Sequence, residues 1–115
     1  MEINIIAAVA ANRAIGYQND TVYFISEDLK RFKQLTTGHT VIMGRKTFHS
    51  LPKGALPNRR NIVLSRTETD FPNCDVYSSL EEALNHIGAE EQAFIIGGAS
   101  LYKEALAIAD RLYLT

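Results

Sequence analysis

The sequence is poor in the side chains that build covalent or metal cross-links. Its single cysteine, Cys74, has no second cysteine to pair with, so neither a disulfide nor a cysteine metal cluster can form within the chain. The three histidines, His39, His49 and His86, are not spaced as metal ligands are. We therefore expect no metal site.

The chain also lacks long apolar runs and a strong excess of either charge. Met1 and Glu2 lead directly into an apolar segment, without the basic start of a signal peptide or a stretch long enough to cross a membrane. The net charge of −1 and the pI near 6.3 argue against a dedicated nucleic-acid-binding protein. With 46% hydrophobic residues over 115 positions, the composition predicts one packed domain, or part of one. The start of the sequence and the lack of a long apolar span predict a cytoplasmic protein.

Acidic residues are missing from one long stretch. Between Asp28 and Glu68 there is no Asp or Glu, while nine of the twelve Lys and Arg residues lie between Lys30 and Arg66. At the centre of this stretch an apolar run ends in a glycine that two cations and a hydroxyl follow, Gly44-Arg45-Lys46-Thr47. Glycine admits a close backbone approach, and free N–H groups at a helix start bind anions. The pattern predicts a site for a small anionic ligand, although a basic surface loop fits these residues equally well.

Apolar runs and helix signals alternate along the whole chain. Residues 3–10 are nearly continuous in apolar side chains, which is typical of a central parallel strand covered on both faces. The alternation predicts an α/β fold with a mostly parallel sheet and right-handed crossovers. Further strands are expected at 61–64, 76–77, 93–96 and 111–115 and in the run before Gly44, with helices at 26–35, after Gly44, at 79–88 and at 99–109.

Three segments carry candidate chemistry beyond the basic stretch. Residues 11–25 are long for a connection and predict a functional lid. Asp28 lies beside the apolar stripe of the helix at 26–35; it either serves the helix dipole or is a carboxylate whose pKa an apolar pocket raises, which suits it to proton transfer. Ser65-Arg66 at a strand end and Gly97-Gly98 at a strand-to-helix turn are two weak phosphate-binding signals, and the glycines do not match the G-x-G-x-x-G spacing.

Together these pieces resemble dihydrofolate reductase of the bacterial type, and the similarity runs from Met1 to Thr115. Six motifs carry it, in the order of that family: Ile5-Ile6-Ala7-Ala8, Ala14-Ile15-Gly16, Asp28-Leu29-Lys30-Arg31-Phe32-Lys33, Val41-Ile42-Met43-Gly44-Arg45-Lys46-Thr47-Phe48, Leu56-Pro57-Asn58-Arg59-Arg60-Asn61 and Ile95-Ile96-Gly97-Gly98.

The resemblance implies a three-layer αβα fold and hydride transfer from NADPH to dihydrofolate. It assigns Asp28 to holding and protonating the pterin ring, with Tyr23 as an aromatic wall nearby, and Arg59 to the glutamate α-carboxylate of the substrate. It also implies binding of antifolate-type molecules. The other implied substrate residues are Ile6, Ala8, Leu29, Phe32, Leu51 and Thr115. The implied cofactor residues are Ala8, Ile15, Gly16, Gly44, Arg45, Lys46, Thr47, Leu64, Ser65, Arg66, Ile96, Gly97, Gly98, Ala99 and Tyr102.

The sequence departs from the family pattern in two places. The family usually reads Leu-Pro-Trp-x-Leu-Pro before the catalytic helix, whereas residues 21–26 here read Thr-Val-Tyr-Phe-Ile-Ser, without the two prolines and the tryptophan. The family chain also continues beyond position 115 into an antiparallel strand pair. Without that pair the strand at 111–115 would be an unprotected sheet edge, through which we expect self-association.

Two other interpretations stay open. The related pyrimidine reductase of riboflavin synthesis shares the fold and cofactor, but Asp28 and Arg59 suit a pterin and a glutamyl tail better. A non-catalytic nucleotide-binding fragment would bind cofactor without oxidising it in the presence of dihydrofolate.

Overall fold

The computed structural model describes residues 1–7, 26–51 and 54–114, and within these it places all but the side chains of 7, 26–30 and 114. A six-stranded sheet forms its centre, in the order β4-β3-β2-β5-β1-β6. Every pairing between the described strands is parallel. The strands are β1 Glu2–Ala7, β2 Thr40–Gly44, β3 Arg60–Leu64, β4 Cys74–Tyr77, β5 Gln92–Gly97 and β6 Arg111–Leu114.

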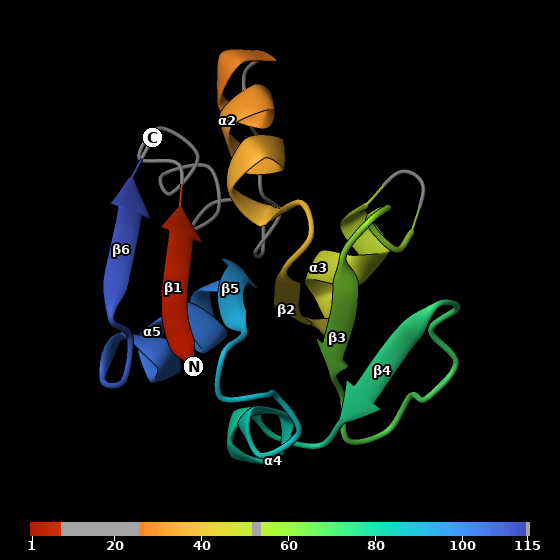
Figure 1. The fold of residues 1–115 in the computed structure, drawn as a ribbon. Coiled ribbons are helices and arrows are strands. Elements are labelled where there is room, and N and C mark those ends of the chain that lie inside the picture. Colours follow the sequence, from red (N-terminus) through yellow and green to blue (C-terminus); the bar gives the residue numbers. More distant parts are fainter. Residues whose placement is uncertain (8–25, 52–53, 115) are drawn as a thin grey trace.

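The sheet is strongly twisted. Neighbouring strands run parallel, yet the arrows of the two edge strands, β6 and β4, point in nearly opposite directions in Figure 1. Each strand is rotated relative to its neighbour, and these rotations add up across the sheet. The central strands are apolar throughout because both faces are covered: Val41, Ile42 and Met43 of β2 have no exposed surface.

Four helices cover the two faces, namely α2 Ser26–Thr36, α3 Arg45–Ser50, α4 Leu80–Leu84 and α5 Ala99–Leu106. On one face, Leu80 of α4 and Leu101 of α5 pack on a cluster that contains Ile42 and Ile95. On the other face, Phe32 of α2 and Phe48 of α3 belong to a second cluster. The prediction of a three-layer αβα fold with a mostly parallel sheet is confirmed. No described helix is long and apolar enough to cross a membrane.

Two predicted helices are too long. The helix expected at 79–88 ends at Leu84, because the following amides of His86 and Ile87 bond back three residues in tight turns rather than four. Its start is as predicted, since the Ser79 hydroxyl accepts a hydrogen bond from the Glu82 amide at 3.1 Å. The helix expected at 99–109 ends at Leu106.

The strand order places a crevice between β2 and β5. The chain leaves β2 toward β3 through α3 on one face, and it leaves β5 toward β6 through α5 on the other face. In open α/β sheets, ligands bind outside the carboxyl ends of the strands where the connections diverge in this way. The topology therefore points to Gly44 and Gly97, the last residues of β2 and β5, as the floor of a site.

Candidate functional site

A cavity of about 350 Å³ opens at this point of the sheet. The segments that follow β2, β3, β4 and β5 all contribute to its wall. Eight of the predicted cofactor residues line it: Gly44, Arg45, Lys46, Thr47, Leu64, Ser65, Arg66 and Gly98. The structure thus brings together three motifs that are separated in sequence by 17 residues or more, counted from Thr47 to Leu64 and from Arg66 to Gly98.

The cations of the cavity have few acidic partners. Arg45 is 46% exposed at its side chain and has one ion pair, a long one of 3.9 Å to the Glu68 carboxylate. Within the described part of the chain, neither Lys46 nor Arg66 forms an ion pair, and both are exposed. Their charge is therefore available to an anion in the cavity.

A buried hydroxyl supports the same conclusion. Thr47 is 2% exposed, yet its Oγ1 has no hydrogen-bond partner among the described residues. Such orphaned polar atoms are rare, because an unpaired buried donor costs about 1–3 kcal/mol. A phosphate oxygen in the cavity would accept this hydrogen bond, so the donor set fits the phosphates of a nicotinamide dinucleotide.

Glycines end the two strands beside the cavity. A Cβ at Gly44 would lie 3.9 Å from the Gly97 oxygen and the Gly98 nitrogen, an ordinary van der Waals distance, so the ends of β2 and β5 are neighbours. Gly97 has φ of 143°, a conformation that side chains other than hydrogen rarely allow, and a cis peptide joins it to Gly98. The glycine before the basic motif and the Gly97-Gly98 turn thus lie close together.

The loop after β3 is fastened to α3. The Glu68 carboxylate lies 3.1 Å from His49 Nε2, within hydrogen-bond distance. The Glu68 amide donates a hydrogen bond to the Ser65 hydroxyl at 3.0 Å. The rings of Phe48 and Phe71 meet edge to face at 5.1 Å. These contacts hold the Ser65-Arg66 segment beside Arg45.

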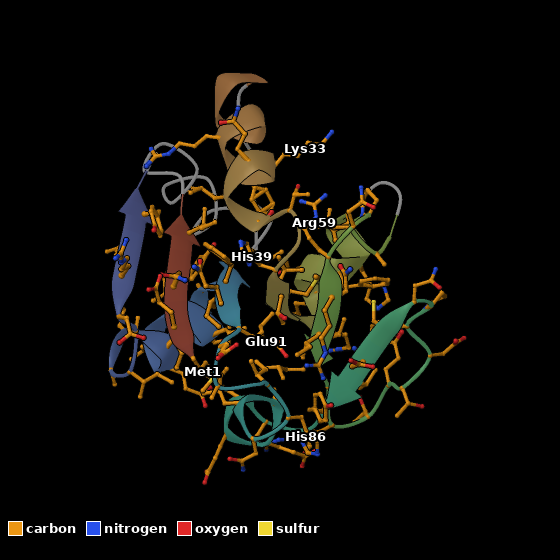
Figure 2. All side chains as sticks on the ribbon, viewed as in Figure 1. Met1, Lys33, His39, Arg59, His86 and Glu91 are labelled. Atoms are coloured by element: carbon orange, nitrogen blue, oxygen red, sulfur yellow. The ribbon has the colours of Figure 1, made fainter. Side chains whose placement is uncertain are left out.

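The predicted substrate residues lie beside the other covered face, at α2. Ile6 and Phe32 are buried in one apolar cluster, and Leu51 packs against it. The Arg59 guanidinium carbon lies 5.9 Å from the centre of the Phe32 ring. The structure therefore brings these four side chains together. Lys33, which was not among the predicted substrate residues, projects from α2 on the side where Arg59 lies (Figure 2).

Arg59 is half-buried without a counter-ion. No carboxylate of the described residues pairs with it. Burial lowers the pKa of its guanidinium from the usual range, although arginine stays charged at any ordinary pH. A half-buried positive charge without an acidic neighbour is an expected feature of an anion-binding group.

Several predicted residues cannot be placed in the site. Ala8, Ile15, Gly16, Tyr23 and Thr115 lie outside the described residues, as do the side chains of Asp28 and Leu29. Ile96, Gly97, Ala99 and Tyr102 are described but do not line the cavity. The Tyr102 hydroxyl lies 2.8 Å from the Ile6 carbonyl and 2.7 Å from that of Ile96, so it joins the ends of β1 and β5.

The cavity also has residues that the sequence did not single out. They share a position just after a strand or in the first turns of a helix: Ser78, Ser79, Leu80, Ser100, Leu101 and Glu104. Ser79 is the N-cap of α4, and neither Ser78 nor Ser100 belongs to a sequence motif that indicates a binding site.

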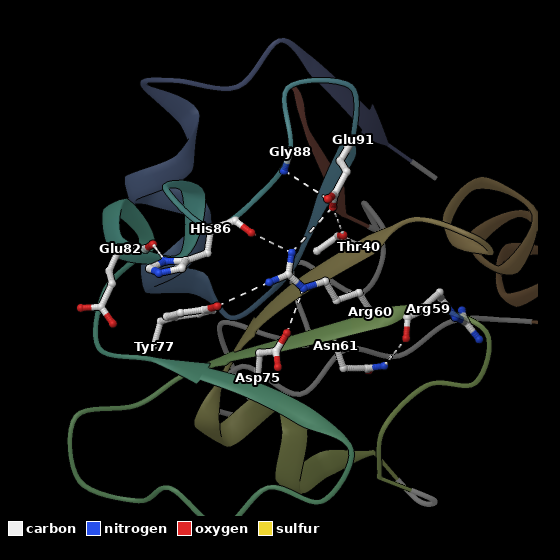
Figure 3. A network of polar contacts seen from close by, with 10 residues as sticks. All are labelled: Thr40, Arg59, Arg60, Asn61, Asp75, Tyr77, Glu82, His86, Gly88 and Glu91. Carbon is white, nitrogen blue, oxygen red and sulfur yellow. Dashed lines mark hydrogen bonds and ion pairs between the residues drawn. The ribbon is translucent and has the colours of Figure 1, made fainter.

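A second cavity, of about 360 Å³, lies at the opposite, amino ends of the strands. Its wall includes Arg60, whose side chain is occupied by protein groups. Nε donates to the Asp75 carboxylate and Nη1 to the His86 carbonyl, each at 2.9 Å (Figure 3). Glu91 lies 3.8 Å from the same guanidinium.

Comparison with known proteins identifies the family and the fold. The family model described as dihydrofolate reductase matches residues 2–115. The chain belongs to the dihydrofolate reductase family. It is 47% identical to dihydrofolate reductase of Bacillus subtilis (strain 168), covering 98% of this chain and 67% of that protein. It is also 47% identical to the type 3 dihydrofolate reductase of Salmonella typhimurium, covering 100% of this chain and 71% of that protein.

A solved structure of the family agrees with the fold. Dihydrofolate reductase from Enterococcus faecalis, complexed with NADP(H) and RAB-propyl, superposes with a TM-score of 0.79 at 27% identity. The match covers 98% of this chain and 68% of that one. The resemblance found in the sequence is therefore confirmed at the level of the family and the fold.

Proposed function

We infer that the chain is an oxidoreductase that uses NADPH to reduce 7,8-dihydrofolate to 5,6,7,8-tetrahydrofolate. The observation that carries this inference is the family match over residues 2–115, together with a cavity in which, among the described residues, Lys46 and Arg66 form no ion pair and the buried Thr47 hydroxyl has no hydrogen-bond partner. A pyrimidine reductase, the first of the two alternatives, would not use the uncompensated charge of Arg59, which suits a glutamyl tail.

The residues of the cavity would hold the cofactor, which supplies the hydride when bound. Arg45, Lys46 and Arg66 would neutralise its phosphates, and the Thr47 hydroxyl would donate to one of them. Gly97 and Gly98 would let the nicotinamide end approach the backbone closely. Tyr102 would support that wall, because its hydroxyl joins the two strand ends beneath it.

Residues at α2 would hold the substrate. Ile6, Phe32 and Leu51 would pack on its rings, and Arg59 would bind the α-carboxylate of its glutamate. Asp28 lies in α2 one turn before Phe32. Its carboxylate would favour the protonated pterin ring, to which hydride is then delivered. The same surface would accept antifolate-type molecules.

The decisive experiment changes Asp28 to Asn. General acid–base assistance contributes about 10²–10⁴-fold, so hydride transfer near neutral pH should slow by that order. As the pH falls, solvent protonates more substrate without help, and the deficit should shrink. The measurement is the pre-steady-state rate of NADPH oxidation with dihydrofolate from about pH 5 to 8, for the parent and Asp28→Asn.

Two outcomes would contradict this role. A deficit that is constant with pH would mean that Asp28 only positions the ring, and no deficit would leave it as a helix-dipole residue. A parent chain that binds NADPH but never oxidises it in the presence of dihydrofolate would instead support the non-catalytic fragment.

We propose that the protein is cytoplasmic, binds no nucleic acid, and self-associates through β6. Among the described strands, β6 is hydrogen-bonded only to β1. Leu106, Ile108 and Leu112, in and before this strand, are 59%, 45% and 49% exposed. An exposed strand edge with apolar side chains is a template for pairing with another chain. Sedimentation over a concentration series should show a mass that rises with concentration, and a constant monomer would contradict the proposal.

A further inference from the structure

Among the described residues, neutral groups alone hold the side chain of Arg59 in place. Its Nε donates to the Pro57 carbonyl at 2.9 Å, and its Nη1 donates to the Thr36 hydroxyl at 3.0 Å. A carbonyl and a hydroxyl fix the direction of the guanidinium without cancelling its charge. The Thr36 contact joins α2 to the segment before β3, across 23 positions of sequence.

Thr36 is oriented so that it can only accept this bond. It has no exposed surface, and its hydroxyl donates to the Phe32 carbonyl, one turn earlier in α2, at 2.8 Å. A hydroxyl has one hydrogen and two lone pairs. With the hydrogen committed to the helix, a lone pair faces Arg59, so the position of the acceptor is fixed by the helix itself.

The backbone at Arg59 is fixed as well. The buried side chain of Asn61 accepts from the Leu56 amide at 2.8 Å and donates to the carbonyls of Leu56 and Arg59 at 2.9 and 3.0 Å. The loop that carries Arg59 is thus closed on itself before β3 begins. In the part of the chain that the structure describes, Thr36 is the one residue that forms a hydrogen bond with a terminal nitrogen of the Arg59 guanidinium.

The Arg59 guanidinium donates to no other group of the described residues, so outer N–H groups are left for a carboxylate. Arginine has five N–H donors, and Nε and one hydrogen of Nη1 are used. The remaining three belong to Nη1 and Nη2, the two nitrogens that form the outer fork. A fork held in advance binds a carboxylate with less loss of side-chain freedom than a mobile one.

We propose that Thr36 is a positioning residue that holds Arg59 ready for the α-carboxylate of the substrate, and thereby contributes to specificity for glutamylated pterins. This proposal rests on the proposed function, because it takes dihydrofolate as the substrate. Thr36 touches no reacting atom, so its removal should weaken binding without slowing the chemical step.

The test compares two ligands that differ in the glutamate. Dihydropteroate is dihydrofolate without its glutamate, so it lacks the α-carboxylate that Arg59 would bind and ends in the aryl carboxylate, which lies closer to the pterin ring. For Thr36→Val, which keeps the shape and removes the hydroxyl, we expect the KM and the calorimetric Kd for dihydrofolate to rise about threefold to tenfold. Both constants for dihydropteroate, and kcat for either substrate, should stay within a factor of two.

Two further variants separate positioning from stability. Thr37 is the matched control, since its hydroxyl bonds back to the Lys33 carbonyl at 2.6 Å as Thr36 does to Phe32, but it does not contact Arg59. Thr37→Val should leave the ratio of the two Kd values unchanged. Thr36→Ser keeps the hydroxyl and should restore that ratio, and Thr36→Ala takes the place of Thr36→Val if valine prevents folding.

The ratio of the Kd values decides the proposal. An equal loss of affinity for both ligands, no loss for either, or a parent that does not prefer dihydrofolate over dihydropteroate would overturn it. So would a full effect of Thr36→Val when Arg59 has already been changed to Gln. Reduction of dihydropteroate by NADPH tests the proposed function separately, because that reaction needs no glutamate.

Discussion

Arg59 and Arg60 are neighbours at the start of β3 and both line the second cavity, but their guanidinium groups have different partners. The Arg59 side chain lies against α2, where a carbonyl, a hydroxyl and the Phe32 ring surround it. The Arg60 side chain lies at the amino ends of the strands, among Asp75, Glu91 and the His86 carbonyl (Figure 3). The charge of Arg59 is available to a ligand, whereas the charge of Arg60 is compensated by Asp75 and Glu91.

The pKa values change in opposite directions, each for its own reason. Burial without an acid lowers the pKa of Arg59, whereas the hydrogen bond that Arg60 donates to the Asp75 carboxylate raises the pKa of Arg60 above the usual arginine value. The presence or absence of an acidic partner therefore separates the structural arginine from the one available to a ligand. Arg45 resembles Arg59 in this respect, since its one acidic contact is long.

Of the changes that test this comparison, Arg59→Gln should have the largest effect. The variant loses a charged, two-pronged partner of the substrate carboxylate, and charge-assisted hydrogen bonds contribute about 1.5–3 kcal/mol. The KM for dihydrofolate should rise about tenfold to a hundredfold, while the unfolding free energy changes little. Steady-state kinetics and denaturant unfolding of the same preparation would measure both, and a marked loss of stability with unchanged KM would reverse the assignment of the two arginines.

Arg60→Gln should give the complementary result with a smaller effect. It removes the ion pairs to Asp75 and Glu91, which are partly exposed, so we expect the free energy of unfolding to fall by about 1 kcal/mol. The KM for dihydrofolate should not change, because Arg60 faces away from α2. If that KM rose as it does for Arg59→Gln, the contrast between the two residues would not hold.

The smallest effect concerns Glu91 and pH. Hydrogen bonds from the Gly88 amide and from the Thr40 hydroxyl lower the pKa of the Glu91 carboxyl from its ordinary value of 4.5. A carboxyl with a lowered pKa in the folded state stabilises the fold fully above its unfolded pKa, and this contribution is lost as the pH falls through the folded value.

The control for that effect is Glu91→Gln, which keeps the shape without the charge. Thermal unfolding from about pH 6 to 3 should show the parent more stable at the upper end, with the gap narrowing below about pH 4.5. A gap that stays constant over this range would mean that the network acts through packing and neutral hydrogen bonds alone.

The fold could be predicted because its signals are local. The apolar run at β1, the glycine at the end of β2 and the serine cap of α4 each fix one element without reference to another. The basic motif after β2 indicated an anion site for the same reason, since a glycine, two cations and a hydroxyl stand side by side in the chain.

The contacts that join distant segments could not be predicted in this way. Only the family resemblance separated Arg59 from Arg60 in the sequence, because their difference depends on which groups pack around each side chain. The bond from Arg59 to Thr36 and the place of Glu104 in the cavity wall likewise arise only when separate elements pack together. The ends of α4 and α5 were misplaced because tight turns, which have no apolar period, follow both helices.

The assembly of the cavity from the ends of four strands has a thermodynamic consequence. No single hairpin or helix pair contains the site, so it exists only when the parallel pairings β2–β3, β3–β4 and β2–β5 have all formed. A ligand of this cavity therefore binds the native state alone and shifts the folding equilibrium of the whole sheet. At a concentration of a hundred times its Kd, such a ligand would add about 2.7 kcal/mol to the free energy of unfolding. The concentration of the cofactor in the cell would therefore help to set the fraction of the chain that is folded.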